Sequence, residues 1–161
     1  MANDSNREVI YFSPRNRKFS FLTNGYSCTF SIDQKEYWHL EGYFQSQKFV
    51  GANTKAEEHI RTAFSPVTCR KIATTYKVST EREKAWDDEL QDIVMMKGLT
   101  TKFMTNSNLG KLLIGTGDKK LVNADTEDEY WGLGKDGKGD NTLGEYLMDV
   151  RDFLKKVYME D

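Results

Sequence analysis

Apolar positions recur every three to four residues over most of the chain, a spacing that predicts helices. The segments with this pattern are 39–50, 55–64, 67–75, 81–104, 107–114 and a last helix that begins near Thr142. A threonine followed three residues later by a glutamate is a capping-box signal. Such pairs begin at Thr54, Thr80 and Thr142, so we expect these threonines to cap three of the helices.

Strands are predicted where β-branched and aromatic residues are enriched. These segments are 7–13 and 28–38, and the second is interrupted by Asp33-Gln34. We therefore expect a strand and then a hairpin, with a further short extended piece at 119–125. A chain of 161 residues without a repeat or a proline-rich linker has the length of one domain. The prediction is one α+β domain over 1–161, mostly helical, with a small antiparallel sheet.

Composition narrows the classes of protein. Charged residues make up 30% and hydrophobic residues 38%, which favours a globular chain that folds alone. No apolar run approaches the roughly 18 residues of a membrane span, and the first residues lack the apolar core of a signal peptide. We expect a cytoplasmic location, no membrane contact and no obligate protein partner.

The net charge argues against one further class of protein, and the counts of cysteine and histidine argue against another. A formal charge of −2 argues against a large basic surface that grips duplex DNA, although one extruded nucleotide could be a substrate. Two cysteines and two histidines predict neither a disulfide framework nor a metal site. We expect no cofactor.

The segment 41–49, EGYFQSQKF, carries the first candidate site. A helix places Glu41, Gln45 and Lys48 on one stripe together with Phe44. Glu41 and Lys48 are then about 10.5 Å apart along the axis, close enough for both side chains to reach one ligand. Charged residues on a helix are often simply exposed to solvent and have no specific function. Because an aromatic residue shares their stripe, a binding or catalytic site is the alternative interpretation.

The second candidate site is the glycine-rich segment 130–146. Gly132, Gly134 and Gly137 fit G-x-G-x-x-G, but the chain ends 24 residues later, too soon for a dinucleotide-binding βαβ unit. A mobile surface loop and a phosphate-binding loop before a helix N-terminus both remain open. Trp131 favours the second, since an aromatic plane beside an anion site suits a nucleotide.

If Thr142 caps the last helix, the backbone amide of Asn141 is free to contact a ligand. Two other basic features have ordinary interpretations. The run RNRK at 15–18 is expected to be a solvated loop, and Lys102, beside Phe103, is expected to extend its amine to the surface.

Five separated segments together resemble the NADAR family, also called YbiA-like. They are 21–49, 65–71, 94–103, 109–122 and 128–151. The resemblance implies a YbiA-like fold and an N-glycosidase that acts at a ribose C1 atom. Known substrate classes of the family are phosphorylated ribosylamino-pyrimidine intermediates of riboflavin synthesis and ADP-ribose attached to guanine.

The resemblance also implies roles for individual residues. Glu41 matches the family's acid, Lys48 its lysine and Asn24 its loop asparagine. The ligand-binding loop is matched by Asp128, Trp131, Gly132 and Asn141. Three positions depart from the family: Trp38 and Gly42 stand where proline and histidine are frequent, and Asn123 where a glutamate is common.

The mechanism that follows uses Lys48 as a nucleophile. A neutral amine can attack C1, open the sugar and hold it as a Schiff base. A free lysine has a pKa near 10.4, so a neutral amine near pH 7 requires a shift of about three units, which we expect from burial among Phe44, Tyr43 and Trp131. Glu41 then gives a proton to the leaving base and later activates water. The alternative is two-carboxylate hydrolysis by Glu41 and Asp128.

For the substrate, we expect an ADP-ribosyl group on guanine, free or linked to nucleic acid. Lys135 and Lys138 add cations to the glycine loop for a diphosphate, and Gly42 leaves room for a large leaving base. The alternatives are the riboflavin intermediates, a non-catalytic module that binds ADP-ribose or a related nucleotide, and a structural or interaction protein.

Overall fold

Helices provide most of the regular structure, as the periodicity predicts. The computed structural model describes residues 6–160. Its elements are β1 (Val9–Phe12), the 3-10 helix η2 (Ser20–Leu22), β2 (Phe30–Ile32), β3 (Lys35–Tyr37), α1 (Leu40–Gln47), α2 (Thr54–Thr62), α3 (Pro66–Thr75), α4 (Thr80–Ala85), the π-helical η3 (Trp86–Leu90), α5 (Gln91–Thr105), α6 (Ser107–Gly115), β4 (Lys120–Asn123) and α7 (Thr142–Met159). The α+β class is confirmed, and the predicted helix 81–104 is the continuous run of α4, η3 and α5.

The predicted helix caps are wrong by one residue. Asn53 caps α2 by accepting a hydrogen bond from the Ala56 amide at 3.0 Å, and Ser79 caps α4 through the Arg82 amide at 3.1 Å. The threonine that follows each of them is the first helical residue. Asparagine and serine are preferred over threonine at the N-cap position, which explains why each helix is capped by the residue before the threonine.

Contacts group the chain into two compact units. The central unit is Asn24–Thr105, and the terminal unit combines Met1–Thr23 with Asn106–Asp161. A single domain over 1–161 stays a prediction. Within residues 6–160, none of the helices has the length and apolar character needed to span a membrane.

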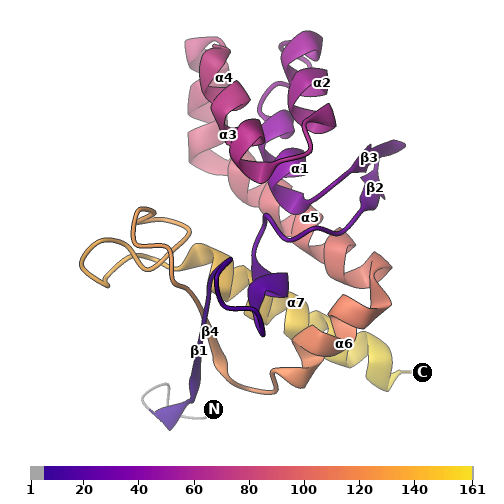
Figure 1. Ribbon diagram of the computed structural model, residues 1–161, viewed down its shortest axis with the longest axis vertical. Coiled ribbons are helices and arrows are strands. Elements are labelled where there is room, and N and C mark those ends of the chain that lie inside the picture. Colours follow the sequence, from indigo (N-terminus) through magenta and orange to yellow (C-terminus); the bar gives the residue numbers. More distant parts are fainter. Residues whose placement is uncertain (1–5, 161) are drawn as a thin grey trace. The chain divides into compact units, whose positions relative to one another are not determined.

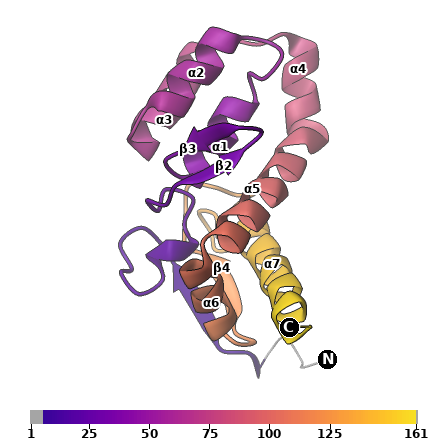
Figure 2. The same cartoon turned by 90° about the vertical axis from the view of Figure 1, so that its right-hand side faces the viewer.

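In the central unit, α1 lies against α2, α3 and α5, and the β2–β3 hairpin packs beside these helices (Figures 1 and 2). The hairpin is antiparallel and turns at Asp33 and Gln34, both with positive φ, where the sequence predicts the break. Gly98 lets α5 approach α1 closely, because a Cβ there would collide with Leu40 and Tyr43. The position of α1 in this core fixes the first candidate site.

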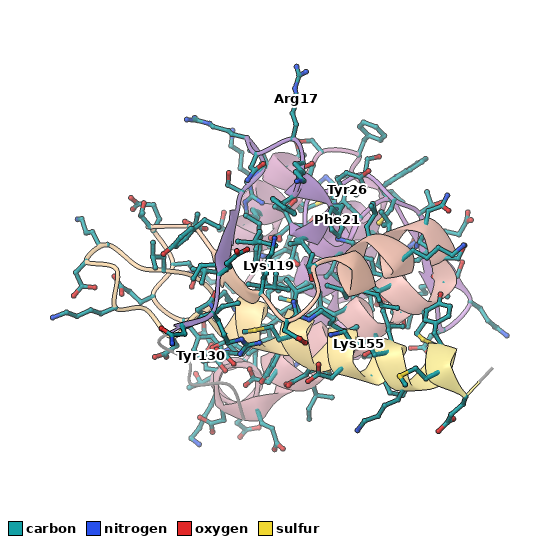
Figure 3. The ribbon with its side chains drawn as sticks, turned by 90° about the horizontal axis from the view of Figure 1, so that it is seen from below. Arg17, Phe21, Tyr26, Lys119, Tyr130 and Lys155 are labelled. Atoms are coloured by element: carbon teal, nitrogen blue, oxygen red, sulfur yellow. The ribbon has the colours of Figure 1, made fainter. Side chains whose placement is uncertain are left out.

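In the terminal unit, β1 and β4 lie side by side and α7 packs against β4 (Figure 1). Their pairing is parallel, so the expectation that all the small sheet is antiparallel is wrong for this pair. Parallel strands need a long connection, and the helices between β1 and β4 provide it. The basic run at 15–18 is an exposed turn as expected, and Arg17 points away from the ribbon (Figure 3).

Candidate active site

The first turn of α1 is fixed by His39, which sequence analysis did not single out. Its Nδ1 accepts a hydrogen bond from the Gly42 amide at 3.0 Å, which makes His39 the N-cap of α1. Nε2 therefore carries the proton and donates to the carbonyl of Phe64 at 2.9 Å. Burial lowers the pKa of His39, which favours the neutral ring that this arrangement requires. The available signal was a polar residue at the first position of the predicted helix 39–50.

Glu41 lies in this first turn and is buried, with 8% of its surface exposed. Its Oε1 accepts a hydrogen bond from Gln45 Nε2 at 2.9 Å, and Nη1 of Arg70 is 3.7 Å from the same oxygen. The backbone amide of Glu41 donates to the carbonyl of Asn24 at 2.9 Å. Glu41, Gln45 and Asn24 are thus brought together, and Arg70 is an additional cation that the sequence pattern did not reveal.

Asn24 also holds a buried acceptor. Its Oδ1 has no hydrogen-bond partner within residues 6–160, while its Nδ2 is 3.7 Å from the sulfur of Met95. An unpaired buried polar atom is uncommon and needs an explanation, such as a ligand contact. The environment is compatible with the predicted role of Asn24 as a loop residue of the site.

Lys48 lies at the C-cap of α1, and its side chain is 26% exposed. Its Nζ is 3.7 Å from Oε1 of Glu83 in α4. Phe44, which was expected to help bury the amine, packs its ring on Trp86 at 5.1 Å. The Tyr43 ring packs against Tyr37 at 5.1 Å, within the aromatic cluster beside the hairpin. Burial of Lys48 is therefore only partial, and a carboxylate is its neighbour.

Gly42 does not leave room for a large leaving base, contrary to expectation. It is buried, and a Cβ there would lie 3.3 Å from the ring of His39 and 3.6 Å from the sulfur of Cys69. The space beside Gly42 is therefore bounded by the capping histidine and by Cys69 of α3.

In the terminal unit, Trp131 is held by its own turn. Oδ1 of Asp128 accepts hydrogen bonds from the amides of Tyr130 at 3.0 Å and Trp131 at 2.8 Å. The indole ring is half-buried and meets the rings of Tyr130 at 4.8 Å and Tyr146 at 6.0 Å. Asn123 donates from Nδ2 to the Trp131 carbonyl at 3.1 Å, a bond that an ionised glutamate could not make.

Most backbone amides of the glycine loop already donate hydrogen bonds within the protein. The expectation that these amides are free to bind an anion is therefore wrong for most of the loop. The amides of Gly137, Gly139 and Asn141 donate to carbonyls within the loop, and the amides of Gly134 and Asp140 donate to the carbonyls of Asp125 and Glu129, just before it. The first amides of α7, at Thr142 and Leu143, donate to the carbonyls of Tyr130 and Trp131. An anion would have to break these bonds to bind here.

Asn141, not Thr142, is the N-cap residue of α7, and its amide is not free. The amide donates to the Gly132 carbonyl at 3.0 Å, while the side chain bonds the Leu121 carbonyl and the Asn123 amide. Gly132 and Gly134 also have packing roles, since a Cβ at either would collide with the Asp125 carbonyl or the Glu129 carboxylate. Their part in ligand binding stays a prediction.

The candidate residues thus form two groups. The group in the central unit is Asn24, Glu41, Gln45 and Lys48, and the group in the terminal unit is Asp128, Trp131, Gly132, Gly134 and Asn141. Within residues 6–160, no cluster of three or more histidine, cysteine or acidic side chains could hold a metal ion.

Lys102 is fully buried, contrary to the expectation that its amine reaches the surface. Its Nζ lies 5.0 Å from the centre of the Phe103 ring and 5.8 Å from that of Tyr26. Burial lowers the pKa of Lys102 to about 8. The sequence shows the neighbouring aromatic residue but not the depth of the site.

Comparison with known proteins gives a consistent group of relatives. The family model described as NADAR domain matches residues 10–155, which include parts of both units. "N-glycosidase YbiA" of Escherichia coli (strain K12) is 34% identical over 146 residues, covering 91% of this chain and 88% of that protein. "Riboflavin biosynthesis protein VVA0006" of Vibrio vulnificus is 31% identical over 152 residues, covering 92% of this chain but 39% of that protein. The NMR structure of E. coli YbiA matches with a TM-score of 0.82 at 30% identity, covering 96% and 89% of the two chains.

Proposed function

Because the chain belongs to the NADAR domain family, we propose that it is an N-glycosidase that hydrolyses the bond between C1 of a ribose and a nitrogen of a base. Relatives that align over most of their length are named N-glycosidases. The observation that carries the proposal is the buried carboxylate of Glu41, which Gln45 and Arg70 hold at the first turn of α1.

Glu41 is the proposed general acid and base. A carboxyl group shielded from water and held by neighbouring donors can deliver a proton to a defined position. In the first half of the reaction that proton goes to the departing base. In the second half the carboxylate takes a proton from water. Gln45 keeps the carboxyl group oriented through both steps.

Lys48 is the proposed nucleophile. Its neutral amine attacks C1 as the bond from C1 to the base breaks. The bond from C1 to the ring oxygen then breaks, a proton passes from the lysine nitrogen to that oxygen, and the opened ribose is held as a Schiff base. Water then adds to this imine and releases the sugar, which restores the amine. The Glu83 carboxylate, 3.7 Å from Nζ, would fix the amine beyond the end of α1 and accept its proton before the attack.

Asn24 and Trp131 are the proposed ligand contacts. The buried Oδ1 of Asn24 needs a donor, and a ribose hydroxyl is the proposed one. Trp131 offers a half-exposed aromatic surface in the terminal unit. Asp128 would act by holding the Trp131 turn, and its direct part in catalysis stays a prediction.

ADP-ribose on guanine remains the first proposed substrate, with the ribosylamino-pyrimidine phosphates of riboflavin synthesis second. Two observations favour the second candidate. The amides of the glycine loop are committed to internal bonds, which removes one argument for a diphosphate. Relatives from Vibrio vulnificus and Zea mays are named riboflavin biosynthesis proteins.

The test is a side-by-side assay of purified protein on ADP-ribosylated guanosine and on a ribosylamino-pyrimidine phosphate, with the released base measured by chromatography. We expect release from the guanosine adduct and about 100-fold slower release by Glu41→Gln. A tenfold or greater preference for the pyrimidine substrate would promote the second candidate. Binding of ADP-ribose without release of base from either substrate would contradict N-glycosidase activity and favour a binding module.

A further inference from the structure

Two aromatic rings lie exposed at the entrance to α1. Trp38 is 45% exposed and Phe64 is 69% exposed, and their ring centres are 5.4 Å apart in an edge-to-face arrangement. Large aromatic side chains are more often buried, and exposed clusters of them mark places where another molecule binds. The exposure of this pair therefore indicates a binding site.

The backbone anchors both rings beside the catalytic turn. The carbonyl of Trp38 accepts a hydrogen bond from the Cys28 amide at 3.1 Å, and the carbonyl of Phe64 accepts one from His39 Nε2 at 2.9 Å. The same His39 ring caps the helix that carries Glu41. Phe64 and the helix that carries Glu41 thus share the His39 anchor, and Trp38 directly precedes His39 in the chain.

The chain limits the distance between Trp38 and Glu41. Trp38 precedes Glu41 by three residues, so their Cα atoms are at most about 11 Å apart even in a fully extended chain. A ribose attached to a base spans this scale. A base over the aromatic pair would therefore place its glycosyl bond near the carboxylate.

We infer that Trp38 and Phe64 form a stacking surface for the leaving base of the substrate, and that this base is a purine. The inference rests on the proposed function, since it assigns the base of the same N-glycosyl bond. Stacking on aromatic side chains is the common way in which proteins hold an unpaired base. Because the two rings are inclined at 68°, a base that stacks on one of them meets the other ring at its edge, and the larger purine has more area for both contacts than a pyrimidine does.

Arg70 supports the choice of guanine. Its guanidinium is half exposed while one nitrogen is 3.7 Å from the Glu41 carboxylate, so it stands next to the reacting group. The arginine fork matches the O6 and N7 acceptors of guanine, whereas a pyrimidine lacks this pair. Stacking would hold the plane of the base, and Arg70 would recognise its edge.

The test uses Trp38→Ala and Phe64→Ala with Trp38→Phe as a conservative variant. Phe153→Ala is the matched control, because Phe153 is similarly exposed, at 47%, but lies on α7 of the terminal unit. Affinity for guanosine and for ADP-ribose is measured separately by ligand-observed NMR titration. Hydrolysis of ADP-ribosylated guanosine gives kcat and KM.

We expect the two alanine variants to weaken guanosine binding and raise KM by about 5- to 150-fold, with kcat within about twofold of the wild type. ADP-ribose affinity should be unchanged, Trp38→Phe should retain most of the guanosine affinity, and Phe153→Ala should have no effect. Unchanged guanosine affinity in both alanine variants would overturn the inference, and so would an equal loss for ADP-ribose.

The guanosine titration does not depend on turnover. If the wild type releases no base, the proposed function fails, while the stacking surface is still judged by guanosine binding. An exposed aromatic patch can also bind a second copy of the same chain, and light scattering tests this alternative by measuring the oligomeric state. A wild-type dimer that becomes a monomer in Trp38→Ala, with unchanged guanosine affinity, would identify the pair as a contact between two copies and overturn the inference.

Discussion

Replacing His39 with alanine removes both anchors of the first turn of α1. The cap on the Gly42 amide is lost, which costs about 0.5 to 2 kcal/mol in comparable helices. The hydrogen bond to the Phe64 carbonyl is lost as well, at about 0.5 to 1.5 kcal/mol. The free energy of unfolding should therefore fall by about 1 to 3 kcal/mol in His39→Ala.

His39→Asn separates the two contributions. Asparagine is a strong N-cap, so this variant should recover the cap without the bond to Phe64. Urea denaturation followed by circular dichroism at pH 7.5 measures both variants against the wild type. A loss below about 0.5 kcal/mol in His39→Ala would refute the reasoning, because the two anchors together are expected to contribute at least about 1 kcal/mol.

The pH dependence of stability provides a second measure of the same contact. The pKa of His39 is lowered in the folded state, so the unfolded chain binds more protons between that pKa and about 6.5. The contribution of His39 is fully present above pH 6.5 and is lost as the pH falls through the folded-state pKa. The variant His39→Asn should lose less stability than the wild type between pH 7 and pH 5. An identical pH profile would show that the neutral ring is not required.

Three further predictions concern the site and the core. Glu41→Gln should keep ligand binding but slow hydrolysis by about 100-fold or more, and a normal rate with lost binding would make Glu41 a positioning residue. Trp131→Ala should weaken substrate binding by about 1 to 3 kcal/mol, as read by titration, and unchanged affinity would leave the glycine loop without a ligand role. Lys102 has its pKa lowered to about 8, so wild-type stability should rise as the pH increases from 8 to 10.5, by up to about 3 kcal/mol. Urea denaturation of Lys102→Met should lack this rise, and an equal rise in both proteins would contradict burial of the amine.

The helical part of the fold could be predicted because its signals are local. Apolar periodicity marks each helix, and Asp33-Gln34 marks the hairpin turn. The parallel pairing of β1 with β4 has no such signal, since the partners are more than a hundred residues apart and neither segment specifies its neighbour.

The candidate site was predictable to a similar extent. The spacing of Glu41 and Gln45 predicts one helical face, and the structure joins them by a hydrogen bond. The amides of the glycine loop could not be assigned in advance, because composition does not reveal which carbonyls they bond. Arg70 lies on another helix, so its approach to Glu41 depends on tertiary packing.

The most direct test of the central claim is reductive trapping on Lys48. Purified protein is incubated with ADP-ribosylated guanosine and borohydride, and peptides are analysed by mass spectrometry. Because an imine is reduced to a stable amine, the account predicts a ribosyl adduct on Lys48. It predicts no adduct and no hydrolysis in Lys48→Arg, and normal behaviour in the control Lys97→Arg, an exposed lysine of α5 that pairs with Asp33. Full hydrolysis by Lys48→Arg would contradict the Schiff-base mechanism.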